Sequence, residues 1–174
     1  MILWCIIIAA LVVFDQVTKL LVAGNMALHE SIPVIPKLFS ITYIHNYGAA
    51  WGMFSEHRWV FLIITAAAII VMPIILYRYR KLHFLFGFSL SMILAGAIGN
   101  MIDRVFLGYV VDFIEATFID FPIFNVADIC VTVGAFLMAF YLIFLDKTFF
   151  VDKPKKKPDG EPDHATDKSE NDTH

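Results

Sequence analysis

The sequence has few charged residues and no strongly basic character. Only 17% of its 174 residues are charged, whereas 59% are hydrophobic, and the mean hydropathy of +0.74 is too high for an ordinary soluble domain. With a net charge of −3, the chain has no basic field that would attract a phosphate backbone, so we expect no nucleic-acid partner. The shortage of charge instead predicts a protein of the lipid bilayer.

The sequence also has only two cysteines, Cys5 and Cys130, and each lies within an apolar run. A thiol in such a run is typical of a small buried hydrophobic group, which argues against a disulfide, a metal ligand or a nucleophile. Neither the HExxH motif of zinc peptidases nor the GxSxG motif of serine hydrolases occurs. We therefore expect no metal and no cofactor.

Long uncharged runs predict membrane-spanning helices at 59–77, 84–102 and 126–145. A fourth span is expected at 2–23, although polar residues in its second half are unusual for a helix that faces lipid. This first run lacks the basic leader and the small-residue cleavage site of a signal peptide, so we expect it to be retained. The fold class is therefore an all-α membrane protein with four transmembrane helices.

Lysine and arginine are concentrated between the second and third spans and after the fourth. Because basic residues near spans are retained in the cytoplasm, both termini are expected there, and segments 24–58 and 103–123 are expected to face outward. The β-branched and aromatic stretch 39–44 predicts a small extracytoplasmic β-structured cap. Residues 1–146 would form the membrane domain, and the polar segment 147–174 is expected to be a disordered cytoplasmic tail.

Aspartates and asparagines converge on the outward ends of the predicted helices. The first helix runs outward, so Asp15 reaches the outer half of the bilayer and Lys19 follows one turn later on the same face. The other polar residues at this level are Asn100, Asp103 and Arg104 at the end of the third helix, Asn125 and Asp128 at the start of the fourth, and Asp112 between them. Such residues are costly in a membrane unless water, pairing or function compensates for them.

Each of these residues, taken alone, can be explained by a structural role and does not require a functional site. Asn125 can be the N-cap of the fourth helix. Asp103 and Arg104 can form an interfacial ion pair, and Asp15 and Lys19 can pair at i and i+4. Convergence of all of them at one depth favours a functional site.

Five motifs appear in order along the chain: DQVTK at 15–19, HNYGAAWG at 45–52, AGAIGNMIDR at 95–104, VVDF at 110–113 and FNVAD at 124–128. Taken alone, the segment 45–52 would suggest an interfacial turn with a tryptophan at the membrane surface. Together the motifs closely resemble those of the bacterial lipoprotein signal peptidases, also called type II signal peptidases, over about the first 146 residues. Ala95 stands where glycine is common and Trp51 where phenylalanine is common, which leaves the chemistry intact.

The resemblance implies an aspartic endopeptidase with Asp112 and Asp128 as its catalytic pair. It implies substrate-binding or supporting roles for Asp15, Lys19, Asn46, Gly48, Asn100, Asp103, Arg104, Asn125 and Ala127. The implied substrate is a diacylglyceryl-modified prolipoprotein, cut within the membrane on the N-terminal side of its lipidated cysteine. The implied inhibitor is globomycin.

We expect a monomer in the bacterial inner membrane, in contact with lipids. The distribution of basic residues would place its active site at the outer leaflet. Two readings from the residues alone remain open. A small transporter or proton channel would also place aspartates at helix ends that face an aqueous cavity. A scaffold that holds partner helices through small residues would tolerate replacement of those aspartates.

Overall fold

The computed structural model describes residues 1–48, 58–79 and 83–146. In these ranges the chain forms, in order, α1 (Ile2–Asn25), β1 (Ser31–Ile35), β2 (Phe39–Asn46), α2 (Arg58–Arg78), α3 (Phe84–Phe106), β3 (Val110–Ala116), α4 (Val126–Phe140) and the π-helical turn η2 (Tyr141–Leu145), which continues α4. The expected disordered tail at 147–174 and the AAWG part of the second motif lie outside the described residues.

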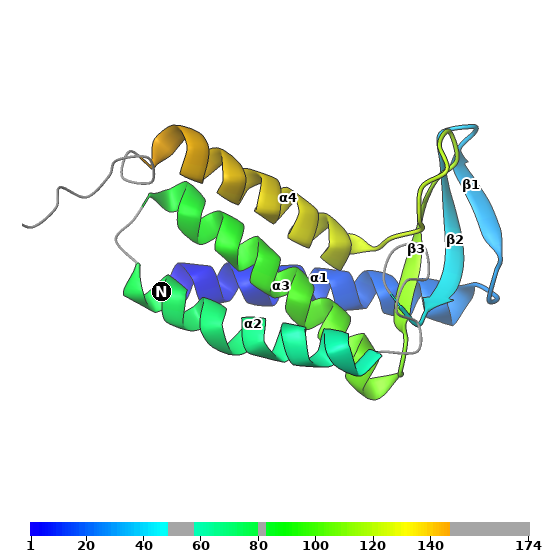
Figure 1. The fold of residues 1–174 in the computed structure, drawn as a ribbon. Helices are drawn as coiled ribbons and strands as arrows, with labels where there is room; N and C mark the ends of the chain where they lie inside the picture. Colours follow the sequence, from blue (N-terminus) through cyan, green and yellow to red (C-terminus); the bar gives the residue numbers. More distant parts are fainter. Residues whose placement is uncertain (49–57, 80–82, 147–174) are drawn as a thin grey trace, which may run out of the picture.

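The four long helices of the described chain lie side by side, and the three strands stand across one end of them (Figure 1). Three helices, namely α1, α3 and α4 extended by η2, are long and apolar enough to cross a membrane; the described part of α2 adds a shorter apolar stretch, Leu62–Arg78. The molecule is therefore mostly helical with a small antiparallel sheet, as predicted.

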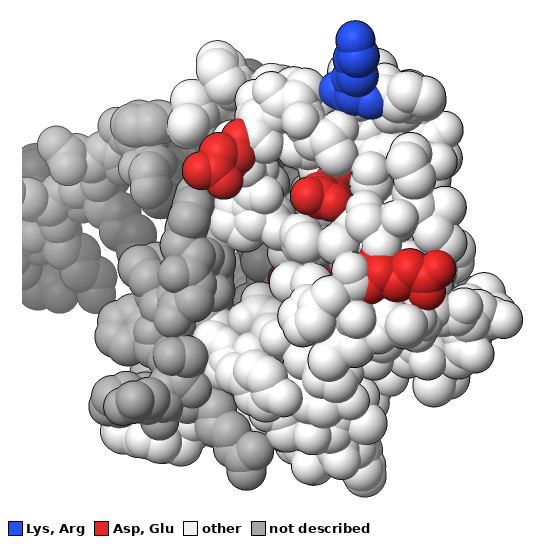
Figure 2. Space-filling model, turned by 90° about the vertical axis from the view of Figure 1, so that its right-hand side faces the viewer, with Lys and Arg blue, Asp and Glu red and all other residues white. Residues whose placement is uncertain are grey.

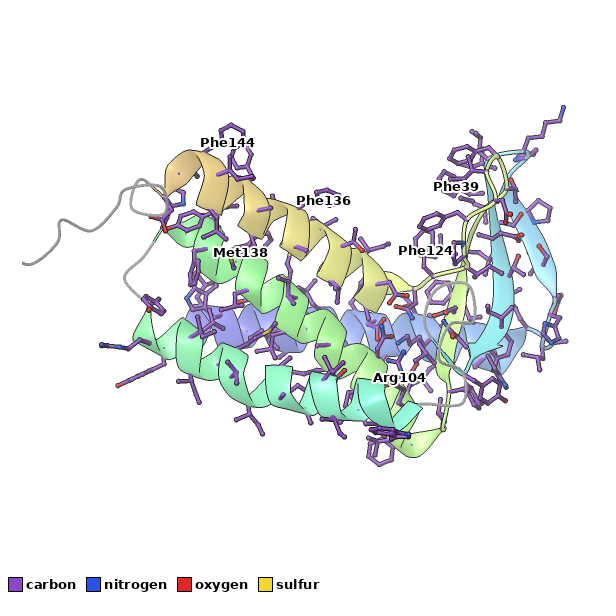
Figure 3. The ribbon with its side chains drawn as sticks, viewed as in Figure 1. Phe39, Arg104, Phe124, Phe136, Met138 and Phe144 are labelled. Carbon is purple, nitrogen blue, oxygen red and sulfur yellow. The ribbon has the colours of Figure 1, made fainter. Side chains whose placement is uncertain are left out.

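Helix α3 packs against α1, α2 and α4, and glycines let α4 approach it closely. A Cβ atom built on Gly96 would lie 2.2 Å from the carbonyl oxygen of Ala127, and one on Gly134 would lie 2.9 Å from that of Ser89. Figure 3 places Met138 between α3 and α4, whereas Phe136 and Phe144 point away from the bundle. The close packing of α3 and α4 fixes the position of the first turn of α4.

The sheet has the order β1-β2-β3, with both pairs antiparallel. Its third strand was not predicted, because we placed Asp112 in an irregular connection between the third and fourth helices and expected the β-structured cap only within the first outward segment, 24–58. Val110–Ala116 pairs with β2, and Ile44 lies opposite Asp112. A hydrophobic cluster of Tyr43, Val111 and Phe113 packs this sheet against the end of α1. Asp112 is therefore held by a sheet ladder.

The turn between α3 and β3 is made by Gly108, whose φ of 87° suits only a residue without a Cβ. The main-chain N–H groups of Leu107 and Gly108 both donate to the carbonyl oxygen of Asp103, which ends the helix. Because this turn is short, β3 starts directly beside the last turn of α3. The sheet thus brings Asp112 to the end of α3 that carries Asp103.

Candidate active site

The buried polar residues gather where α1, α3 and α4 meet the sheet. Those of the predicted site with less than a tenth of their surface exposed are Asp15, Lys19, Asn100, Asp103, Asp112 and Asn125. Figure 3 shows Arg104 and Phe124 on either side of this junction. On the end of the molecule that carries the sheet, charged side chains are scattered over a mostly uncharged surface (Figure 2). The charges of the site therefore lie inside the protein.

Asn125 joins the two aspartates of the predicted catalytic pair. Its Nδ2 donates to Oδ1 of Asp112 at 2.6 Å, and its main-chain N–H donates to Oδ2 of Asp128 at 3.2 Å. In return, its Oδ1 accepts the main-chain N–H of Asp128 at 2.9 Å, which completes a capping box at the start of α4. The N-cap explanation of Asn125 is thus correct, and the same residue also brings two carboxylates together.

Each carboxylate of the pair accepts a second N–H from another asparagine. Asn46 Nδ2 donates to Oδ2 of Asp112 at 2.8 Å, and Asn100 Nδ2 donates to Oδ1 of Asp128 at 2.8 Å. The main-chain N–H of Gly48 donates to Oδ1 of Asn46 at 2.9 Å and so fixes the orientation of that amide. Both carboxylates are therefore oriented by two donors each.

Burial raises the pKa of Asp112 from 3.8 to about 7, and the neighbouring charge of Asp128 acts in the same direction. The hydrogen bonds from Asn46 and Asn125 and the charge of Lys19 act in the opposite direction. A buried carboxyl with such a pKa can hold or release a proton near neutral pH, which is the property that acid–base catalysis requires.

A second group of charges lies behind the pair. The ammonium of Lys19 contacts Oδ2 of Asp15 and Oδ2 of Asp103, each at 3.0 Å. Gln16 donates to Asp15 at 3.2 Å and to Asp103 at 3.0 Å. The expected pairing of Asp15 with Lys19 is present, and Asp103 also pairs with Lys19. Our sequence analysis did not include Gln16 among the site residues, although it lies beside Asp15 in a span where polar residues are unusual.

Main-chain groups connect this second group to the rest of the site. The N–H of Ala127 donates to Oδ1 of Asp15 at 2.8 Å, and the N–H of Val111 donates to Oδ2 of Asp103 at 3.0 Å. Arg104 donates to the carbonyl oxygens of Gly48 at 3.3 Å and of Asn100 at 3.4 Å. All eleven residues predicted for the site are thus placed at one junction.

A cavity of about 520 Å³ opens beside the two carboxylates. The residues that line it are Asn46, Gly48, Asn100, Arg104, Val110, Asp112, Phe121, Pro122, Ile123, Phe124, Asp128, Ile129, Thr132 and Val133. Sequence analysis missed its apolar wall, formed by Phe121–Phe124 and one face of α4. Helical spacing could have indicated that face, because Thr132 lies four residues after Asp128 and Ile129 four after Asn125.

His45 lies on β2 but belongs to an aromatic cluster. Its ring stacks on Tyr109 with centroids 3.6 Å apart, and its Nε2 lies 2.8 Å from the hydroxyl of Tyr43. It pairs with Val111, next to Asp112 in the strand. Among the residues that the structure describes, no group of three or more His, Cys, Asp or Glu is arranged to hold a metal ion.

Apolar helices that bring two carboxylates together beside an apolar cavity place the molecule in a class, the membrane proteins with a two-carboxylate site. Comparison with known proteins identifies the family within that class. A family model described as signal peptidase (SPase) II matches residues 7–144. The chain therefore belongs to the signal peptidase II family, which makes it a bacterial membrane peptidase of the aspartic type.

Individual relatives agree with this family. The chain is 47% identical over 138 residues to a lipoprotein signal peptidase of Symbiobacterium thermophilum, covering 78% of this chain and 91% of that protein. It is 44% identical over 145 residues to one of Brevibacillus brevis, covering 83% and 97%. A bacterial membrane enzyme solved by the in meso method at 2.3 Å resolution superimposes with a TM-score of 0.77 at 37% identity, covering 87% of this chain and 94% of that one.

Proposed function

We propose that this chain cleaves the signal peptide from diacylglyceryl-modified prolipoproteins within the membrane, on the N-terminal side of the lipidated cysteine. Asp112 and Asp128 are the proposed catalytic pair. The observation that carries this proposal is the bridge by Asn125, which holds both carboxylates at the edge of an apolar cavity. The name shared by the relatives, lipoprotein signal peptidase, supports the substrate class.

Peptide hydrolysis by two carboxylates requires opposite protonation states. One ionised carboxylate takes a proton from the attacking water, and one protonated carboxyl donates a hydrogen bond to the scissile carbonyl oxygen. The raised pKa of Asp112 supports this division, since burial beside Asp128 favours a single proton shared by the pair. The proton then passes to the amine of the leaving peptide.

The rest of the site supports substrate binding. The guanidinium of Arg104 lines the cavity and carries a positive charge that can stabilise a developing oxyanion or bind a lipid phosphate. The apolar side chains of Ile129 and Val133 also line the cavity, and they are 40% and 39% exposed. An apolar wall on the outside of a helix bundle suits a substrate that arrives from the bilayer with acyl chains attached.

The topology that we propose has four spans, with α2 as the fourth. Met1 and the last described residue, Asp146, lie at the end of the bundle opposite the sheet, which supports placing both termini on one side (Figure 1). The basic residues of the α2–α3 connection and the tail favour the cytoplasm for that side. The site and its sheet would then lie at the outer leaflet of the inner membrane. We expect the enzyme to act as a monomer in contact with membrane lipids, without a cofactor.

The decisive experiment incubates purified protein with a lipidated precursor and follows cleavage by gel shift, with and without globomycin. We expect cleavage that globomycin blocks and that the variant Asp128→Asn lacks. Retained cleavage in that variant would contradict the aspartic pair, and sensitivity to a chelator would count against a metal-independent mechanism. Proteoliposomes containing the same protein should show no proton or solute flux; flux without cleavage would favour the transporter reading instead.

A further inference from the structure

The ammonium of Lys19 is the centre of the charges that lie behind the proposed catalytic pair. It contacts Asp15 and Asp103 at 3.0 Å each and Oδ1 of Asn100 at 2.9 Å. Only 3% of the Lys19 side chain is exposed. The charged groups of the cluster come from every neighbouring element, namely Asp15 of α1, Asp103 and Arg104 of α3, Asp112 of β3 and Asp128 of α4.

The two carboxylates that pair with Lys19 hold the two segments that carry the pair. Asp15 accepts the N–H of Ala127, the residue before Asp128. Asp103 accepts the N–H of Val111, the residue before Asp112. One cation therefore connects the start of α4 to the start of β3. It adds to the antiparallel bridge between Ile114 of β3 and Phe124, which lies just before α4.

Lys19 also decides which way the amide of Asn100 points. An ammonium can only donate hydrogen bonds, so it requires the oxygen of that amide. Asn125 Nδ2 donates to the same oxygen at 3.1 Å. The NH₂ group of Asn100 is thereby directed to Asp128, where it donates at 2.8 Å. Without the ammonium, one of the two donors that fix the amide orientation is lost.

We propose that Lys19 is a positioning residue, which sets the separation of Asp112 and Asp128 through Asp15 and Asp103 and aims Asn100 at Asp128. This inference rests on the proposed function of the pair. Lys19 acts through these three side chains and is not assigned a contact with the substrate.

Lys19 holds these side chains through a charged group, so its removal also has an electrostatic effect on the pair. A purely structural residue would have no such effect. The positive charge of Lys19 lowers the pKa of Asp112. Its removal therefore moves both limbs of the bell-shaped pH dependence of kcat to higher pH, because both ionisations of the coupled pair become harder. A fault confined to folding would reduce the amount of active enzyme and leave both limbs in place.

The test compares Lys19→Met with Gln16→Met, in full-length protein that cleaves a lipidated precursor. Gln16 donates to the same two carboxylates, Asp15 and Asp103, so its replacement disturbs them while leaving the ammonium in place. For Lys19→Met we expect kcat to fall about 100-fold, as for a misplaced catalytic group, with both limbs moved to higher pH. For Gln16→Met we expect a smaller fall and unmoved limbs.

Lys19→Gln serves where Lys19→Met does not fold, since its amide can still donate to Asn100 while the charge is gone. Unmoved limbs in the folded Lys19 variant, or kcat close to wild type, would overturn the inference. Loss of folded protein in both Lys19 variants would assign the ammonium to folding alone and also overturn it. The wild-type reaction separates these outcomes from the proposed function: if wild-type enzyme fails to cleave, the function itself is wrong.

Discussion

Helices α2 and α3 have 21 and 23 residues and are both mainly apolar, yet they differ in what they bury. Helix α3 buries Asn100 and Asp103 at the end beside the sheet, whereas the buried side chain that the structure describes on α2 is Leu76. A long apolar sequence is therefore sufficient for a helix to join this bundle. A helix that contributes residues to the site differs in having a polar end that is buried against the neighbouring helices and the sheet.

The polar end of α3 is stable because its groups are paired inside the protein. In the described part of the chain, no buried side-chain nitrogen or oxygen lacks a hydrogen-bond partner. Unpaired, such groups would each cost roughly 1–3 kcal/mol and more where charged. The contrast between α3 and α2 predicts that substitutions at the polar junction will damage activity, while those on α2 will be tolerated.

The largest effect is expected from Asp112→Asn. This change keeps the shape of the side chain but removes one of the two carboxyl groups of the proposed catalytic pair, so kcat should fall by about 10⁴-fold or more. Single-turnover cleavage of a lipidated precursor measures it. A fall of less than tenfold, with the fold intact by circular dichroism, would show that the polar junction of α3 is structural, like the apolar packing of α2.

A smaller loss is expected from Asn125→Ala. The variant loses the Nδ2 donor to Asp112 but keeps the main-chain N–H that donates to Asp128. Removal of such a side-chain donor typically costs about 100-fold in kcat. It also loses the capping box of α4, worth about 1 kcal/mol of stability. Kinetics and thermal unfolding of the same preparation separate the two. Activity that falls only in proportion to folded protein would mean that Asn125 is nothing more than a cap.

The helices could be predicted from the sequence, whereas the third strand of the sheet could not. The helices follow from uncharged runs, a local signal that needs no partner. Strand β3 was missed because Val110–Ala116 pairs with β2, which lies more than 60 positions earlier, and because Asp112 interrupts its apolar pattern. The separation of 128 − 112 = 16 positions gave no indication that one residue, Asn125, would donate hydrogen bonds to both carboxylates, to Asp112 from its side chain and to Asp128 from its main chain.

The site residues were predictable as a group, but their partners were not. Asp15, Asp103 and Lys19 were expected at one depth because helix direction and rise determine depth. Which of them pair depends on how α1, α3 and α4 are rotated, and that is decided by close contacts such as those at Gly96 and Gly99. A single sequence contains no local signal for rotation.

Gly99→Ala tests the contribution of that close packing. A Cβ atom at Gly99 would lie 2.5 Å from Oδ2 of Asp15, so Asp15 must move and its hydrogen bond to Ala127 must weaken. We expect kcat to fall about tenfold through displacement of the pair. On α2, the matched truncation Ile64→Ala, at a side chain 63% exposed, should change kcat by less than about twofold. If both variants lowered kcat equally, the proposed difference between α3 and α2 would be contradicted.

The smallest effect is a pH dependence of stability. Because the pKa of Asp112 is raised from 3.8 to about 7 in the folded protein, the folded state binds more protons than the unfolded state between those values. The free energy of unfolding therefore falls as pH rises through this window. In detergent, Tm should drop by roughly 2–4 °C for each kcal/mol lost, and Asp112→Asn should flatten this slope. An unchanged slope would contradict the burial of the Asp112 charge.

The capping box at the start of α4 has a consequence for biosynthesis. Because Asn125 and Asp128 belong to the last of the long helices to leave the ribosome, an incomplete chain carries Asp112 without its partner. On the proposed mechanism, a nascent chain therefore gains hydrolytic activity only when α4 has been inserted and its first turn has formed. Insertion of this helix and completion of the carboxylate pair are one event.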